Sequence, residues 1–155
     1  MGLNNIIGIT IDSNTLIYFF ENHQEYAQDI EDLFLIVESG EINAFLSSLS
    51  ILEILVKPKR DKNLVLENKY KTLLLNFPNL YTIDINMKVI DVAASIRADY
   101  KIKTPDSIII STAIITNSKY LISNDIRLRN VCNEMNLSLV TMPDLRNNKG
   151  YFCRT

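Results

Sequence analysis

Residues 6 to 12 read Ile6-Ile7-Gly8-Ile9-Thr10-Ile11-Asp12, a β-branched run that ends at an acid. A short apolar run of this kind predicts a strand buried within a sheet. Ser13-Asn14-Thr15 follow it, and small polar residues favour the start of a helix. The stretch therefore predicts a buried strand, an acid at its carboxyl end and then a helix.

The same alternation of short strands and longer helices continues along the chain. We expect further strands over residues 42–46, 80–83, 120–123 and 137–141. We expect helices over residues 16–20, 24–38, 47–56, 61–76, 86–100 and 107–117, with one more beginning at Asn124-Asp125. This alternation is typical of an α/β fold with a largely parallel sheet. No repeat interrupts it, so we expect one domain over residues 1–145 and a polar tail over residues 146–155.

Composition agrees with a globular domain, since 47% of the 155 residues are hydrophobic and 22% are charged. No apolar run reaches the roughly 18 residues of a membrane span. The first twenty residues lack a basic start and contain Asp12, so we expect no signal peptide. Cys132 and Cys153 have no zinc-ligand spacing. We therefore expect a cytoplasmic protein with no membrane association and with reduced thiols.

The charges are distributed unevenly although the net charge is only −2. Residues 1–56 hold nine acids and no Lys or Arg, whereas all sixteen basic residues come later. This asymmetry is compatible with an acidic centre bordered by basic arms. It is equally compatible with one acidic surface helix.

Three aspartates occupy positions where a strand gives way to a helix or a helix begins. Asp12 and Asp125 follow predicted strands, and Asp106 follows Pro105 at a helix start. Each of them also suits a helix cap or first turn without any further role. Open α/β sheets, however, bind ligands beyond the carboxyl ends of their strands. These acids are therefore candidates for a binding site at that edge.

Glu53 lies inside the strongly apolar segment from Leu49 to Val56. A capping box from Ser50 to Glu53 is one explanation. That explanation needs a helix starting at Ser50, whereas Ser47 or Ser48 directly follows the predicted strand. With the earlier start, Glu53 is a carboxylate on a mostly buried helix, which is costly without a cation.

Four segments together carry a resemblance to a known family: Ile11–Tyr18, Ser47–Glu53, Thr104–Ala113 and Leu121–Asp125. In these segments the sequence resembles the PIN-domain ribonucleases, especially the VapC-type toxins of toxin–antitoxin pairs. The most specific segment is Thr104–Ala113, a Pro-Asp start followed by a helix of small and β-branched residues. Ser107, Ser123 and Leu128 depart from the residues frequent in the family, but no carboxylate is lost.

The resemblance implies a single PIN-like domain with a five-stranded parallel sheet in the order 3-2-1-4-5, flanked by helices. It implies four catalytic carboxylates that also bind one or two Mg²⁺ or Mn²⁺ ions: Asp12, Glu53, Asp106 and Asp125. Asn14 and Ser123 would support them by hydrogen bonds. Carboxylates gathered in this way repel one another without metal, so we expect raised pKa values among them.

The activity implied is metal-assisted endonucleolytic hydrolysis of RNA, leaving a 5′-phosphate and a 3′-hydroxyl. The resemblance also implies a homodimer and a cognate antitoxin protein that reaches a groove near the site. Candidate contacts to RNA phosphates are the basic residues near Glu53 and Asp125: Lys57, Lys59, Arg60, Lys62, Arg127 and Arg129. The lysines among them can equally form a solvated helical face. His23, in a polar loop, is not expected to act as a base, and Tyr18–Phe20 are expected in the core or at a dimer contact.

Three other interpretations have weaker support. A haloacid-dehalogenase-like phosphatase needs a second acid two residues after the first, where this chain has Asn14, and a late glycine-aspartate element that is missing. A signalling receiver domain needs an acidic pair after the first strand, and Asp84 is a poor phosphorylation site. A PIN-like module that only binds RNA or protein would be expected to lack a carboxylate, and all four are present.

Overall fold

We describe residues 5–147 and residue 152 of the protein from a computed structural model. Five strands form one parallel sheet in the order β3-β2-β1-β4-β5. Their bounds are Ile7–Ile11 for β1, Ile42–Ser47 for β2, Leu80–Ile83 for β3, Tyr120–Ile122 for β4 and Ser138–Val140 for β5. The predicted α/β class, strand order and parallel pairing are confirmed. Strand β1 is central, with Ile9 paired to Ala44 of β2 and to Tyr120 of β4.

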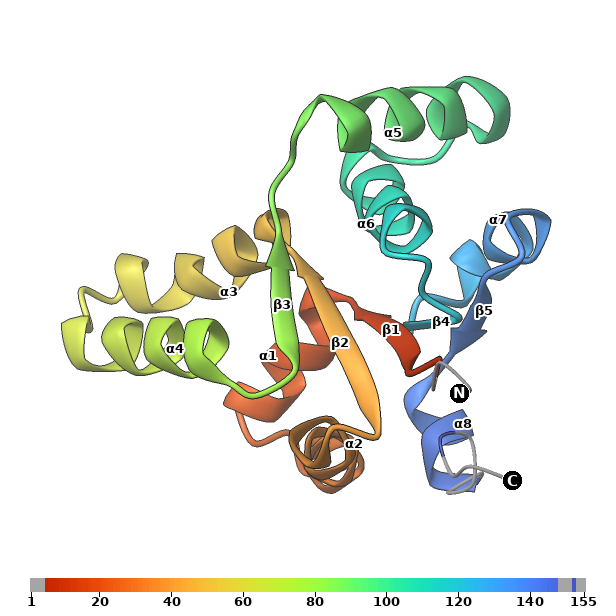
Figure 1. Ribbon diagram of the computed structural model, residues 1–155. Helices are drawn as coiled ribbons and strands as arrows, with labels where there is room; N and C mark the ends of the chain where they lie inside the picture. The colour runs from red at the N-terminus through yellow and green to blue at the C-terminus, as the bar shows by residue number, and fades with distance from the viewer. Residues whose placement is uncertain (1–4, 148–151, 153–155) are drawn as a thin grey trace.

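Helices cover both faces of this sheet (Figure 1). Their bounds are Ser13–Phe20 for α1, Ala27–Ser39 for α2, Ser48–Arg60 for α3, Leu64–Asn76 for α4, Met87–Tyr100 for α5, Thr104–Ile115 for α6, Arg129–Glu134 for α7 and Met142–Asn147 for α8. Side chains of a strand point alternately to the two faces. Accordingly Ile122 of β4 packs in the cluster formed with α1–α4 and α8, whereas the neighbouring Leu121 packs in the cluster with α5–α7.

Helix α3 begins directly after β2, and this start positions Glu53. The Ser47 hydroxyl accepts a hydrogen bond from the Leu49 N–H at 3.2 Å, so Ser47 is the cap of the helix. Ser50 lies inside the helix and is buried. The capping-box alternative for Glu53 is therefore wrong, and Glu53 projects from the middle of α3.

Most of the predicted polar tail over residues 146–155 lies outside the described residues, which at this end of the chain are 146, 147 and 152. Helix α8 crosses the expected boundary at residue 145, and Leu145 and Phe152 are buried in the core. The Asn124 side chain accepts the Met142 N–H at 2.8 Å and so ties the start of α8 to the segment after β4. That segment also differs, since a short 3₁₀ turn at Ile126–Leu128 precedes α7.

The residues outside the candidate site have ordinary structural roles. The side chain of Cys132 is buried, and burial raises the pKa of its thiol to about 12; Cys153 lies outside the described residues. Tyr18, Phe19 and Phe20 pack against the core, as predicted. His23 stacks on Tyr26, with ring centroids 5.0 Å apart.

No helix within residues 5–147 is long and apolar enough to cross a membrane.

Glu67 is a nearly buried carboxylate of α4 that two lysines contact. Lys59 Nζ of α3 and Lys71 Nζ of α4 both donate to its Oε1, at 2.7 and 2.6 Å. The hydrogen bond from Lys59, followed by that from Lys71, holds the pKa of Glu67 below its usual value. The pair with Lys59 links α3 to α4.

We expect Glu67→Gln to unfold at lower urea concentration than the wild type at neutral pH. Because the native pKa is depressed, ionised Glu67 stabilises the fold above its ordinary pKa of 4.5, and this contribution disappears as the pH falls through the lower native value. Urea unfolding at a series of pH values should show the stability gap closing towards acid. Glu134→Gln, an exposed change on α7, is the control. A gap that stayed constant with pH would contradict the assignment.

Candidate active site

Four carboxylates from separate segments line one open pocket of about 380 Å³: Asp12, Glu53, Asp106 and Asp125. Asp12 follows β1, and Asp125 comes three residues after the end of β4. These adjacent strands are where the chain order of the sheet reverses, since β2 and β3 lie on one side and β5 on the other. Such a switch point is the usual ligand site of an open parallel sheet. The structure therefore brings the four predicted acids together there.

Asp12 occupies the position before α1, yet its side chain does not cap the helix. Its backbone N–H donates to the Ile122 carbonyl at 3.0 Å, which fixes it against β4. Its carboxylate accepts hydrogen bonds from the Ser123 hydroxyl at 2.8 Å and the Ser13 hydroxyl at 3.2 Å. The simple capping explanation for Asp12 is thus excluded. Ser123 contacts a pocket carboxylate directly, whereas Asn14 lines the pocket as an exposed side chain.

Ser13 is a further site residue, one that the sequence pattern does not single out. Its side chain is buried, and its hydroxyl also donates to Glu53 Oε2. A hydroxyl has one proton, so Ser13 donates its hydrogen bond either to Asp12 or to Glu53 at any moment. It links α1 to α3 at the floor of the pocket. The only signal in the sequence is its place next to Asp12.

Asp106 lies in the first turn of α6 and is half-buried. Burial raises the pKa of its carboxyl, and the negative charges of Asp125 and Asp12 raise it further. The direction of this shift agrees with the expectation of raised pKa values among the clustered acids, although burial is its largest cause. The repulsion also shows that these three acids share one electrostatic environment.

The pKa of Asp125 shifts in the opposite direction to that of Asp106, because Arg127 contacts both oxygens of the Asp125 carboxylate. Arg127 Nε donates to Oδ1 at 2.8 Å and Nη2 donates to Oδ2 at 2.6 Å. These hydrogen bonds hold the pKa of Asp125 below its usual value. Asp125 also accepts the Arg127 backbone N–H at 3.1 Å and so caps the 3₁₀ turn. In Asp125 the capping role and the pocket position coexist.

Most of the basic residues predicted to contact RNA do not line the pocket. Lys57 pairs with Glu21, Lys59 with Glu67 and Arg129 with Asp144, and Arg60 lies 3.8 Å from Asp61. Lys62 is exposed in the turn between α3 and α4. Of the six predicted residues, Arg127 is the one that lines the pocket. Lys103 lines it as well, and its place just before Thr104-Pro105-Asp106 is the available signal.

The donor set suits a hard divalent cation, because carboxylate oxygens are the ligands that Mg²⁺ and Mn²⁺ prefer. Within residues 5–147 and at residue 152, however, no three His, Cys, Asp or Glu side chains are already arranged to hold an ion. Arg127 covers both oxygens of Asp125, and Ser13 engages Glu53. The four carboxylates are thus ligands of the right chemical kind for the ion. Their side chains would have to rotate before they could bind it together.

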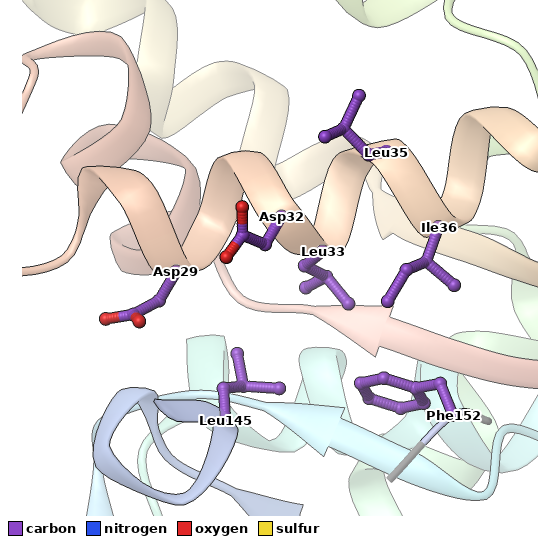
Figure 2. Close-up of a pocket in the computed structure, with 7 residues that line it drawn as sticks. All are labelled: Asp29, Asp32, Leu33, Leu35, Ile36, Leu145 and Phe152. Carbon is purple, nitrogen blue, oxygen red and sulfur yellow. The ribbon is translucent and has the colours of Figure 1, made fainter. Parts of the chain in front are cut away.

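A second cavity, of about 340 Å³, lies between α2 and the C-terminal segment (Figure 2). Figure 2 shows Leu33 and Ile36 of α2 pointing towards Phe152, and Leu35 pointing away. The cavity wall is mostly apolar, and Asp29 at its edge is paired with Arg146 at 2.7 Å. This cavity lacks a set of free carboxylates and is no alternative to the first as an active site.

Comparisons with known proteins agree with the geometry. The family model of the PIN domain matches residues 9–134. A search of curated proteins finds no match. Among solved structures, VapBC2 from Rickettsia felis bound to a promoter DNA fragment is similar with a TM-score of 0.68 and 20% identity, covering 87% of this chain and 98% of that chain. A toxin–antitoxin complex from Klebsiella pneumoniae is similar with a TM-score of 0.65 and 21% identity, covering 86% of this chain and 97% of that chain. DNA-bound VapBC from Salmonella typhimurium is similar with a TM-score of 0.62 and 17% identity, covering 88% of this chain and 98% of that chain.

These structures share the fold of this chain, and the residues matched by the family model include most of β1, the whole of β4 and all four pocket acids. The chain belongs to the PIN domain family.

Proposed function

We propose that this protein is a metal-dependent endoribonuclease of the VapC type, which hydrolyses RNA phosphodiester bonds. The observation that carries the proposal is the convergence of Asp12, Glu53, Asp106 and Asp125 on one open pocket at the switch point of the sheet. Four acids held together without a local counter-charge for each would be destabilising unless a cation balanced them. The pocket is open to solvent, so a polymer can reach the carboxylates.

The four carboxylates are the residues that would hold one or two Mg²⁺ or Mn²⁺ ions. Such an ion, when bound, neutralises phosphate charge and lowers the pKa of a coordinated water. The protein's own residues position the acids: Ser123, directly after β4, donates a hydrogen bond to Asp12, and Ser13 of α1 donates one to Glu53. Asp106, whose pKa is raised, acts as a ligand only in its ionised form.

Lys103 and Arg127 supply the positive charge at the pocket wall. In the proposed complex they contact phosphates of the RNA backbone. Such contacts orient the backbone without reading the bases. Sequence preference would then come from other parts of the surface.

We also propose a cognate antitoxin, a homodimer and a cytoplasmic location. The antitoxin is supported by the toxin–antitoxin assemblies among the similar structures. Apolar side chains also lie exposed beside the site: Leu52 and Val56, one turn apart on α3, flank Glu53. A partner segment that covered them would close the pocket to RNA.

The test is cleavage of end-labelled RNA by purified protein with Mn²⁺, with Mg²⁺ and with EDTA, beside single-stranded DNA of the same sequence. We expect fragments from RNA in either metal, none in EDTA and little cutting of DNA. Cleavage that survived EDTA would contradict the metal requirement. Folded protein that left every RNA intact in both metals would favour a module that only binds.

A further inference from the structure

Arg127 is a cationic residue of the pocket that contacts one of the four carboxylates directly. Its guanidinium contacts both oxygens of Asp125, at 2.8 and 2.6 Å, within a three-residue turn. The two side chains differ in exposure, since that of Asp125 is 18% exposed and that of Arg127 is 73% exposed. The guanidinium thus covers the acid from the solvent side of the pocket.

A divalent ion bound by Asp125 needs at least one oxygen that Arg127 now occupies. A guanidinium and a divalent ion at the same carboxylate repel each other, so the two compete. Exposed ion pairs contribute little to stability, so a divalent ion can displace Arg127 at small cost.

We propose that Arg127 is a positioning residue with two alternating partners: it holds Asp125 while the metal is absent, and it binds an RNA phosphate once the metal has displaced it. The inference rests on the proposed function. The planar guanidinium can bind a phosphate through two parallel hydrogen bonds, as it now binds the carboxylate. After displacement it remains at the pocket wall near Lys103.

The two partners make metal and RNA binding mutually favourable. When an RNA phosphate binds Arg127, Asp125 is free to bind the metal. When the metal binds Asp125, Arg127 is free to bind RNA. By thermodynamic linkage each ligand must then raise the affinity for the other by the same factor.

The test compares Arg127→Gln and Arg127→Lys with the wild type. Isothermal titration with Mn²⁺ alone reports metal affinity, and RNA cleavage at saturating Mn²⁺ reports KM and kcat. We expect Arg127→Gln to bind Mn²⁺ about 3- to 10-fold more tightly, because a competitor is gone. We expect its KM for RNA to rise roughly 10-fold, because a charged hydrogen-bond donor is lost. Arg127→Lys, with a single ammonium, should have a Mn²⁺ affinity and a KM between those of the wild type and those of Arg127→Gln.

Arg146→Gln is the matched control, because Arg146 contacts Asp29 in the same manner outside the pocket. It removes the same charge and should change neither quantity. Merely structural damage would not tighten metal binding, so the sign of the change is diagnostic. The inference is overturned if Arg127→Gln binds Mn²⁺ no more tightly than Arg146→Gln, and its phosphate half is overturned if KM stays unchanged. If neither the wild type nor any variant binds Mn²⁺, the metal-dependent function itself is wrong.

Discussion

Asp106→Asn should lower the rate of RNA cleavage by roughly 100-fold or more, because a metal ligand supports several kcal/mol of transition-state stabilisation. Asn keeps the size of the side chain and removes the charge. Asp106 lies in the first turn of α6 and is not tied to a neighbouring basic residue as Asp125 is to Arg127. The fold should therefore tolerate the change, and the loss should reflect chemistry.

Initial rates with end-labelled RNA in Mn²⁺ measure this effect. Asp91→Asn is the control, since Asp91 is exposed on α5 and undergoes the same chemical change. Circular dichroism confirms that both variants are folded. A variant at Asp106 that cut RNA at the wild-type rate would exclude this carboxylate from the reaction.

Ile110→Ala should lower the free energy of unfolding by about 2–5 kcal/mol, because it leaves a cavity in a packed core. Ile110 is fully buried on α6, in the cluster between the sheet and α5–α7. Ile90→Ala removes the same atoms from a helix position that is 44% exposed and should cost less than about 1 kcal/mol. Urea unfolding followed by circular dichroism measures both. Equal losses in the two variants would show that Ile110 is not in a close-packed core.

The strands and the order of the acids are predictable because they depend on local patterns. The run Ile6–Ile11 is recognisable as a buried strand, and Pro105 marks the start of α6. Parallel strands bring residues at their carboxyl ends together, so the strand pattern alone places Asp12 and Asp125 at one edge of the sheet. The resemblance to PIN-domain ribonucleases adds Glu53 and Asp106 to that edge.

Contacts between side chains are not predictable in the same way, because they depend on how separate elements dock. Only its place before Pro105-Asp106 sets Lys103, on the pocket wall, apart from Lys59, which pairs with Glu67 of α4. Ser13 joins the site only because its hydroxyl on α1 reaches Glu53 on α3. Within the predicted polar tail over residues 146–155, the polar composition gives no sign that Phe152 packs in the core.

The most direct measurement is an anomalous difference map from a crystal of the protein soaked in Mn²⁺. We expect a peak in the pocket, about 2 Å from carboxylate oxygens of at least two of the four acids: Asp12, Glu53, Asp106 and Asp125. Arg127 should have left Asp125 if that acid is among the ligands. A pocket without a peak, in crystals of protein that cleaves RNA with Mn²⁺, would contradict the assignment of the metal to these carboxylates.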